Sequence, residues 1–195
     1  MFEIYLKKLS VAFDFSFFAA VSLLILLKDS DYALYGLAAC IWHELGHLTA
    51  MRFCNIGVKR VFFYGAGIKI VPDKQFAFTD FLRELVILLA GSGANFVLAA
   101  ALFLGNKMGL TPFAAVNAAI GLFNLLPLQY LDGGKLAVLL IRRFCGIDHA
   151  DSAEWYLKWG GVVLIAVILA TAIIFEKGNL TLYAVLGCLL ISAFS

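Results

Sequence analysis

The sequence predicts an all-α polytopic membrane protein with about six transmembrane helices and a short membrane-associated β-hairpin between the second and third. Three observations predict this class. Of the 195 residues, 63% are hydrophobic and only 14% are charged. Apolar runs of about 18 residues or more also recur along the chain, and such runs are typical of membrane helices. No repeat or composition shift marks a second domain, so residues 1–195 are expected to form a single transmembrane domain.

Six apolar segments are the expected membrane spans. They run over residues 11–27, 32–54, 82–104, 112–126, 157–175 and 179–195. The fourth continues beyond Pro127 into a second apolar piece at 134–141. Because proline lacks a backbone N–H and clashes with the preceding turn, a helix break is expected there.

The stretch between the second and third segments differs in kind. Residues 55–81 contain two β-rich runs, 61–64 and 68–71, on either side of Gly65-Ala66-Gly67. This pattern is typical of a hairpin. Because open sheet edges are not tolerated in lipid, we expect the hairpin to pack on protein or to line a wet cavity.

The placement of lysine and arginine predicts the orientation in the cell membrane. With the N-terminus inside, only Lys28, Lys107 and Lys177 of the fifteen basic residues fall in outside loops. Cytoplasmic segments are enriched in such residues, so both termini are expected in the cytoplasm. The net charge is +2 and no basic cluster resembles a nucleic-acid footprint, so the expected surroundings are lipid and not nucleic acid.

The stretch His43-Glu44-Leu45-Gly46-His47 places ionisable groups inside the second apolar segment. On a helix, histidines four residues apart share one face and can bind one metal ion. In an HExxH pattern the glutamate serves a metal-bound water. Each ionisable group at membrane depth costs at least a few kcal/mol, so it marks function by default. The alternative is a set of polar groups that bridge packed helices.

A catalytic zinc site usually needs a third protein ligand. The candidates for this ligand are the carboxylates Asp14, Glu84 and Asp132. Asp132 stands out because it lies in NLLPLQYLDGGK, where Pro127 breaks the helix and Gly133-Gly134 loosen the chain. A broken helix can aim a carboxylate at a buried ion. The alternative is an ordinary turn, since Asp-Gly is a common turn pair.

Together, these two motifs resemble the site-2 protease family (peptidase family M50) of intramembrane zinc metalloproteases. That family pairs HExxH in one span with NxxPxxxxDG in a later one, and the matches are His43 to His47 and Asn124 to Gly133. The resemblance implies zinc as the cofactor, with His43, His47 and Asp132 as its ligands. It implies Glu44 as the catalytic base and Asn124 as a group that holds the substrate backbone or the oxyanion.

A weaker likeness lies in AGSGANF, where Gly91 and Asn95 fit the Gly-x-x-x-Asn of the family and Ser92 replaces its usual proline. Asn95 is therefore a candidate substrate-binding residue, with a helix-packing role as the alternative.

The resemblance covers residues 33–145 and is greatest to the sporulation branch, which releases a membrane-tethered sigma-factor precursor. It implies a membrane-tethered protein substrate whose helical segment must unwind, and a place for a membrane regulatory partner. The hairpin at 60–71 could pair with that unwound segment, or could be a structural ribbon. The sequence carries neither the CBS domain of that branch nor the PDZ domain of others, so regulation through those domains is not expected.

His43 and His47 lie in the later half of an inward-running span, which places the site nearer the cytoplasmic face. His149 is expected to be a solvated loop residue. The alternative to a protease is a catalytically inactive or metal-carrying membrane protein that uses the same ligands. A metallopeptidase with glutamate as third ligand is disfavoured because no suitably buried glutamate follows Glu44.

Overall fold

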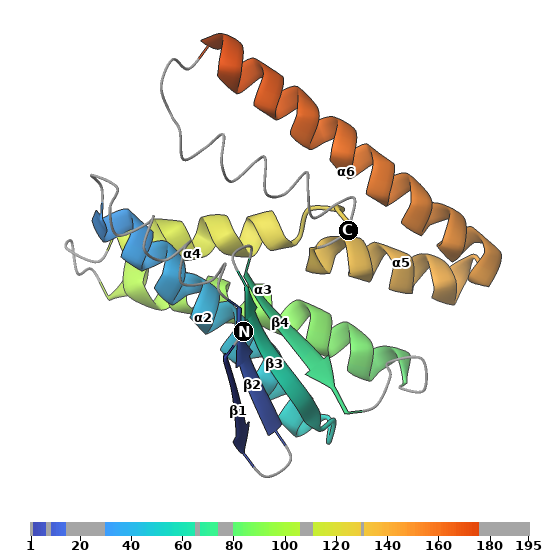
Figure 1. The fold of residues 1–195 in the computed structure, drawn as a ribbon, viewed down its shortest axis with the longest axis horizontal. Helices are drawn as coiled ribbons and strands as arrows, with labels where there is room; N and C mark the ends of the chain where they lie inside the picture. The colour runs from blue at the N-terminus through green and yellow to red at the C-terminus, as the bar shows by residue number, and fades with distance from the viewer. Residues whose placement is uncertain are drawn as a thin grey trace. The chain divides into compact units, whose positions relative to one another are not determined.

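The computed structural model describes residues 2–6, 9–14, 30–64, 67–73, 80–105, 111–129 and 131–175. The chain divides into two compact units, Met1–Leu125 and Leu126–Ser195, and each is described by itself. The first unit contains a four-stranded sheet and the helices α2, α3 and α4 (Figure 1). The second contains the helices α5 and α6.

The sheet consists of β1 (Phe2–Leu6), β2 (Leu9–Phe13), β3 (Val58–Tyr64) and β4 (Gly67–Pro72), in that spatial order. β1 pairs with β2 and β3 with β4 in antiparallel fashion, whereas β2 and β3 run parallel. The hairpin predicted from residues 61–64 and 68–71 is therefore confirmed as β3 and β4. The all-α assignment is corrected, because the N-terminal strands enlarge the hairpin into a sheet.

The first predicted span is wrong at its beginning. Residues 11–13 belong to β2, where Val11 pairs with Val61 and Phe13 with Phe63. The rings of Phe13 and Phe63 stack with centroids 4.7 Å apart. A short apolar run is compatible with a half-buried strand as well as with a helix. Here the run forms a strand because its side chains pair with those of the neighbouring β3. The remainder of 11–27 lies beyond Asp14, outside the described residues.

Arg60 ties the two hairpins of the sheet together. From β3 its guanidinium donates to Ser10 Oγ on β2 at 3.2 Å and forms an ion pair with Glu3 on β1. The pKa of Glu3 is held below its ordinary value, chiefly by the hydrogen bond from Arg60. One side chain thus links three adjacent strands.

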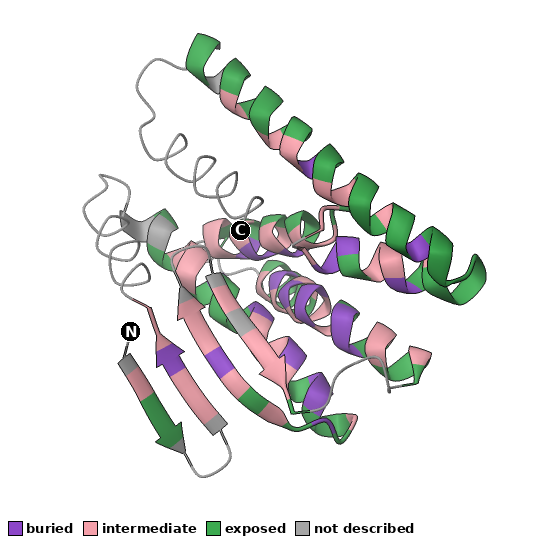
Figure 2. Ribbon diagram, turned by 45° about the vertical axis from the view of Figure 1, so that its right-hand side comes forward, coloured by how far each residue is buried: buried purple, intermediate pink, exposed green. Residues whose placement is uncertain are grey.

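Three helices of the first unit pack on one another: α2 (Ser30–Phe53), α3 (Phe81–Leu104) and α4 (Thr111–Asn124). The first two confirm the helices predicted at 32–54 and 82–104. α3 carries many of the buried positions (Figure 2). A Cβ added at Gly46 of α2 would lie 2.5 Å from the carbonyl oxygen of Ala90 on α3. Glycine at 46 therefore permits the close approach of these helices.

An apolar cluster joins the end of α2 to α3 and the sheet. Its buried members are Ala50, Met51, Ile56 and Ile87, with Cys54, Val58, Ile70 and Ala90 packed against them. α2 ends because Asn55 adopts a left-handed backbone conformation, with φ of 55°. The N–H of Ile56 then bonds back to the carbonyl of Met51 at 2.9 Å. Such a helix ending satisfies otherwise unpaired carbonyls and turns the chain toward β3.

In the second unit, α5 (Asp132–Phe144) and α6 (Ile147–Phe175) pack on each other and are joined by Cys145 and Gly146. Gly146 has φ of 99°, a conformation that favours glycine. α6 begins ten residues before the apolar segment predicted at 157–175 and is largely exposed (Figure 2). His149 is exposed as expected, but it lies in the first turns of α6 and not in a loop.

Two described helices, Phe81–Leu104 and Ile147–Thr171, are long and apolar enough to cross a membrane. The six predicted spans are not confirmed. The fourth became α4, which at 14 residues is only about 21 Å long, shorter than the roughly 30 Å of a hydrocarbon core. It ends at Asn124, before Pro127, as the proline predicted. The segment 179–195 lies outside the described residues.

Candidate metal centre

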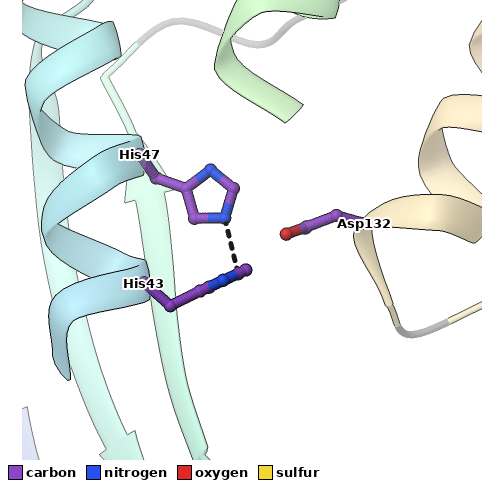
Figure 3. Close-up of side chains that lie close together, drawn as sticks. All are labelled: His43, His47 and Asp132. Atoms are coloured by element: carbon purple, nitrogen blue, oxygen red, sulfur yellow. Dashed lines mark hydrogen bonds between the residues drawn. The ribbon is translucent and has the colours of Figure 1, made fainter. Parts of the chain in front are cut away.

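His43 and His47 project from adjacent turns of α2 toward one point (Figure 3). Both side chains are buried, with 4% and 8% of their surface exposed. Their Nε2 atoms are 3.1 Å apart and their rings meet edge to face. Two nitrogen ligands of a tetrahedral zinc lie about 3.3 Å apart when each bond is about 2.0–2.1 Å. The spacing of the pair therefore fits two ligands of one ion.

A backbone carbonyl on α3 fixes the tautomer of His47. The Nδ1 atom of His47 lies 2.7 Å from the carbonyl oxygen of Ile87. Because a carbonyl oxygen can only accept, Nδ1 carries the hydrogen and donates it. In a neutral imidazole the other nitrogen, Nε2, then keeps its lone pair. This is the arrangement in which metal-ligating histidines are commonly held.

Gly91 leaves room for both rings. A Cβ added at Gly91 would lie 2.4 Å from His47 Nε2 and 2.6 Å from His43 Nε2. No side chain larger than hydrogen fits there without moving the histidines. The sequence singled out Gly91 by motif, and the structure supplies the steric reason.

Asp132 is the first residue of α5 in the second unit, and 7% of its surface is exposed. Its Oδ1 accepts a hydrogen bond from Lys135 Nζ at 3.2 Å. The first turn of a helix favours a negative charge, which stabilises the ionised carboxylate. A Cβ at Gly134 would lie 2.0 Å from the carbonyl oxygen of Leu128, so glycine allows the chain to fold back where α5 begins.

His43, His47 and Asp132 each offer one atom that can ligate a metal ion. All three are buried, whereas the competing carboxylates Asp14 and Glu84 are only half-buried. Two imidazoles and one carboxylate match the three-ligand sets of catalytic zinc sites, in which a fourth position takes water. The donor chemistry of these residues thus fits zinc.

The two polar residues that the HExxH and NxxP motifs add to this set lie in the first unit. Glu44 follows His43 on α2 and is half-buried. Asn124 is the last residue of α4, is also half-buried, and donates from Nδ2 to the carbonyl oxygen of Ile120 at 3.0 Å. One further N–H of that amide can serve another acceptor, since the group has two.

Asn95 is fully buried on α3, and the structure gives it partners that the sequence reading did not name. Its Nδ2 donates to the carbonyl oxygen of Ala39 at 3.2 Å and to Asn117 Oδ1 at 3.3 Å. Asn117 is also fully buried. Sequence reasoning missed it, although a polar amide in the apolar segment 112–126 was the available signal.

Trp42 is a second residue that the sequence reading passed over. From α2 its indole N–H donates to the carbonyl oxygen of Ala94 on α3 at 3.0 Å. No sequence pattern marks this contact, because its acceptor is a backbone oxygen.

Comparisons with known proteins agree with this description. No family model matches the chain. Over 66 residues the chain is 33% identical to a Rickettsia conorii protein named "Putative zinc metalloprotease RC0203". That match spans 33% of this chain and 18% of the Rickettsia protein. The solved structure of the site-2 protease from Methanocaldococcus jannaschii matches 99% of this chain and 93% of its own, with a TM-score of 0.73 and 17% identity.

The chain therefore has the fold of a site-2 protease, and the resemblance expected from its two motifs is confirmed at the level of fold. Within that fold it carries a buried histidine pair of metal-ligating geometry on α2.

Proposed function

We propose that this protein is an intramembrane zinc metalloprotease that cleaves peptide bonds in or near the transmembrane segment of a membrane-tethered protein. The observation that carries the proposal is the convergence of His43 and His47 Nε2 at 3.1 Å, with the His47 tautomer fixed by Ile87. The name of the Rickettsia relative and the fold of the archaeal protease support the same reading.

In this proposal His43, His47 and Asp132 hold one zinc ion. Zinc bound by such a set supplies a Lewis acid that activates water and polarises the scissile carbonyl. The backbone of α3 sets the orientation of His47 through Ile87. Lys135 donates a hydrogen bond to Asp132, and the first turn of α5 is a favourable place for a negative charge. These contacts ready the three side chains to act as ligands.

Glu44 acts as the general base and then as the general acid. It takes a proton from the attacking water as the new C–O bond forms, and it delivers a proton to the amine as the C–N bond breaks. One water is consumed for each peptide bond cleaved. Its half-buried position beside His43 suits a group that must exchange protons with solvent.

Asn124 stabilises the oxyanion or holds the substrate backbone. One amide hydrogen is engaged by Ile120, and the second can be donated to the developing negative charge. Such a donor acts more strongly where bulk water is excluded.

The substrate must unwind, because the peptide bonds of a helix are shielded by their own hydrogen bonds. β4 lies at one edge of the described sheet, so one side of its backbone is available for an extended peptide. From the sequence resemblance we propose a sporulation sigma-factor precursor as the substrate and a membrane protein as the regulator. We also place the enzyme in the cytoplasmic membrane as a multi-pass protein, with both termini and the zinc site toward the cytoplasm.

The decisive measurement is zinc per chain in detergent-purified protein, with wild type beside Asp132→Asn. About one zinc per chain in the wild type and a marked loss in the variant would show that Asp132 contributes to the same zinc site as the HExxH helix. A well-folded wild type without zinc, or an Asp132→Asn variant that keeps it, would refute the proposed ligand set.

Glu44→Gln separates the protease from the alternative, a metal carrier or an inactive relative. A protease should keep its zinc and lose cleavage of a co-expressed membrane-tethered substrate. A carrier should keep both its zinc and its metal transport.

A further inference from the structure

Asn95 has no amide hydrogen left for a substrate. Its Nδ2 donates to the carbonyl oxygen of Ala39 and to Asn117 Oδ1, at 3.2 and 3.3 Å. An asparagine amide has two N–H hydrogens, and these two acceptors account for both. The remaining polar atom, Oδ1, is an acceptor and cannot stabilise an oxyanion. Asn95 is also fully buried.

The orientation of Asn117 supports this assignment. Its Nδ2 donates to the carbonyl oxygen of Phe113, one turn earlier on α4, at 2.9 Å. The nitrogen side of the amide is therefore turned to its own helix, and Oδ1 is left to accept from Asn95. The result is a buried chain of hydrogen bonds that runs from α4 through α3 to α2.

The α2 end of this chain is joined directly to a candidate ligand. In an α-helix the carbonyl of residue 39 accepts the backbone N–H of residue 43. The carbonyl oxygen of Ala39 thus receives two hydrogen bonds, from the backbone of His43 and from Asn95. A carbonyl oxygen has two lone pairs and can accept both. A displacement of the Asn95 side chain would therefore alter the hydrogen bonding of the carbonyl that accepts the backbone N–H of His43.

Two other contacts tie α2 to α3 along the same stretch. Trp42 donates to Ala94 at 3.0 Å, and His47 donates to Ile87 at 2.7 Å. The side chain of Asn95 bonds to α2 and also reaches α4. Its bond to α2 lies one turn before His43, whereas the bond to Ile87 is made by His47 itself.

We propose that Asn95 and Asn117 are positioning residues, which lock the turn of α2 before His43 and thereby set the spacing of the histidine pair. This inference rests on the proposed metal centre. It replaces a substrate contact for Asn95 with a role in holding the ligands. It also adds Asn117, which the sequence motifs do not include.

The test compares metal binding by Asn95→Leu, Asn117→Ala and the control Thr49→Ala in the full-length, detergent-purified chain. Thr49 donates to Leu45 at 2.7 Å, so its loss removes a side-chain hydrogen bond that lies within α2. Zinc affinity is measured by competition with a chromophoric chelator. Ligand geometry is read from the visible absorption of the Co²⁺-loaded protein, a signature that a merely structural role would not move.

For Asn95→Leu we expect zinc affinity to fall about tenfold, the lower end of what loss of an outer contact costs a metal site. The Co²⁺ bands should shift as well. Asn117→Ala should change both in the same direction by less, since the bond to Ala39 remains. Thr49→Ala should match wild type.

The proposal would be overturned if the Asn95→Leu variant had the same Co²⁺ spectrum as wild type and a zinc affinity within twofold of the wild-type value. If Asn95→Leu does not yield folded protein, the same criterion applies to Asn117→Ala. A folded wild type that binds neither Zn²⁺ nor Co²⁺ would overturn the metal centre and this proposal together. Failure of the proposal alone is thus distinguishable, because wild type and variants would then bind alike.

Discussion

Gly91 on α3 lies directly against His47 on α2, so that a Cβ at position 91 would come within 2.4 Å of His47 Nε2. The same Cβ would lie 2.6 Å from Nε2 of His43. Real Cβ atoms do not approach other heavy atoms this closely, so the absence of a side chain is a steric requirement. On the α3 side, the two histidine rings therefore pack directly against the backbone of Gly91.

Gly91→Ala should therefore displace the ligand atoms and abolish stoichiometric zinc binding. Gly93→Ala is the matched control, because the same methyl group on the same helix would meet nothing within 4 Å. Zinc per chain by elemental analysis checks the difference. Equal zinc in the two variants would show that the histidine pair is not the binding site.

Gly46→Ala should loosen the contact between α2 and α3. The added Cβ would lie 2.5 Å from the carbonyl oxygen of Ala90 and 2.8 Å from Ala94 Cβ, and neither can move without its helix. Overpacking of this kind typically costs about 1–3 kcal/mol of the free energy of unfolding. Unfolding in detergent measures the loss. Gly36→Ala, on the same helix and with nothing within 4 Å, should not be destabilised, and an equal loss there would contradict the explanation.

Gly134→Ala should disrupt the turn that presents Asp132. Its Cβ would meet the carbonyl oxygen of Leu128 at 2.0 Å, so the backbone before α5 would have to move. We expect increased protease cleavage between residues 125 and 135, together with reduced zinc. Gly160→Ala, on α6 with nothing within 4 Å, is the control. An unchanged cleavage pattern in Gly134→Ala would refute the steric argument.

The link between Glu3 and Arg60 should depend on pH. The pKa of Glu3 is held below its ordinary 4.5, chiefly by the hydrogen bond from Arg60. A carboxyl whose folded pKa is lowered contributes stability above its unfolded pKa and loses that contribution as pH falls through the folded pKa. Protection of β1 amides from hydrogen exchange should thus be greater in wild type than in Glu3→Gln at pH 6. The difference should shrink as pH falls below 4.5 and through the folded pKa of Glu3, and a difference that does not change with pH would argue against the ion pair.

Local patterns predicted the parts of the fold whose partners are close in sequence. The hairpin of β3 and β4 was predicted because both strands and the glycine-rich sequence between them lie within fifteen residues. β2 was taken for the start of a span. Its partner β3 is about fifty residues away, and nothing within Leu9–Phe13 distinguishes a strand from an apolar helix.

The candidate site divides in the same way. The spacing of His43 and His47 fixes their common helix face, so the pair could be predicted from the pattern alone. The backbone acceptors between α2 and α3 could not be predicted, because Ile87, Ala39 and Ala94 contribute carbonyls, which every residue has. The part of Asn117 was missed for a related reason, since its partner lies on another helix.

The parallel pairing of β2 with β3 also imposes an order of events during synthesis. β2 cannot pair with β3 until Arg60, which lies opposite Ser10 and fifty positions later in the sequence, has been synthesised. At about 5–20 residues per second, roughly 3–10 seconds separate their appearance. α2 is made entirely within that interval. The helix that bears the histidines is therefore synthesised after β2 and before β3, so the sheet is completed only once α2 has already been made.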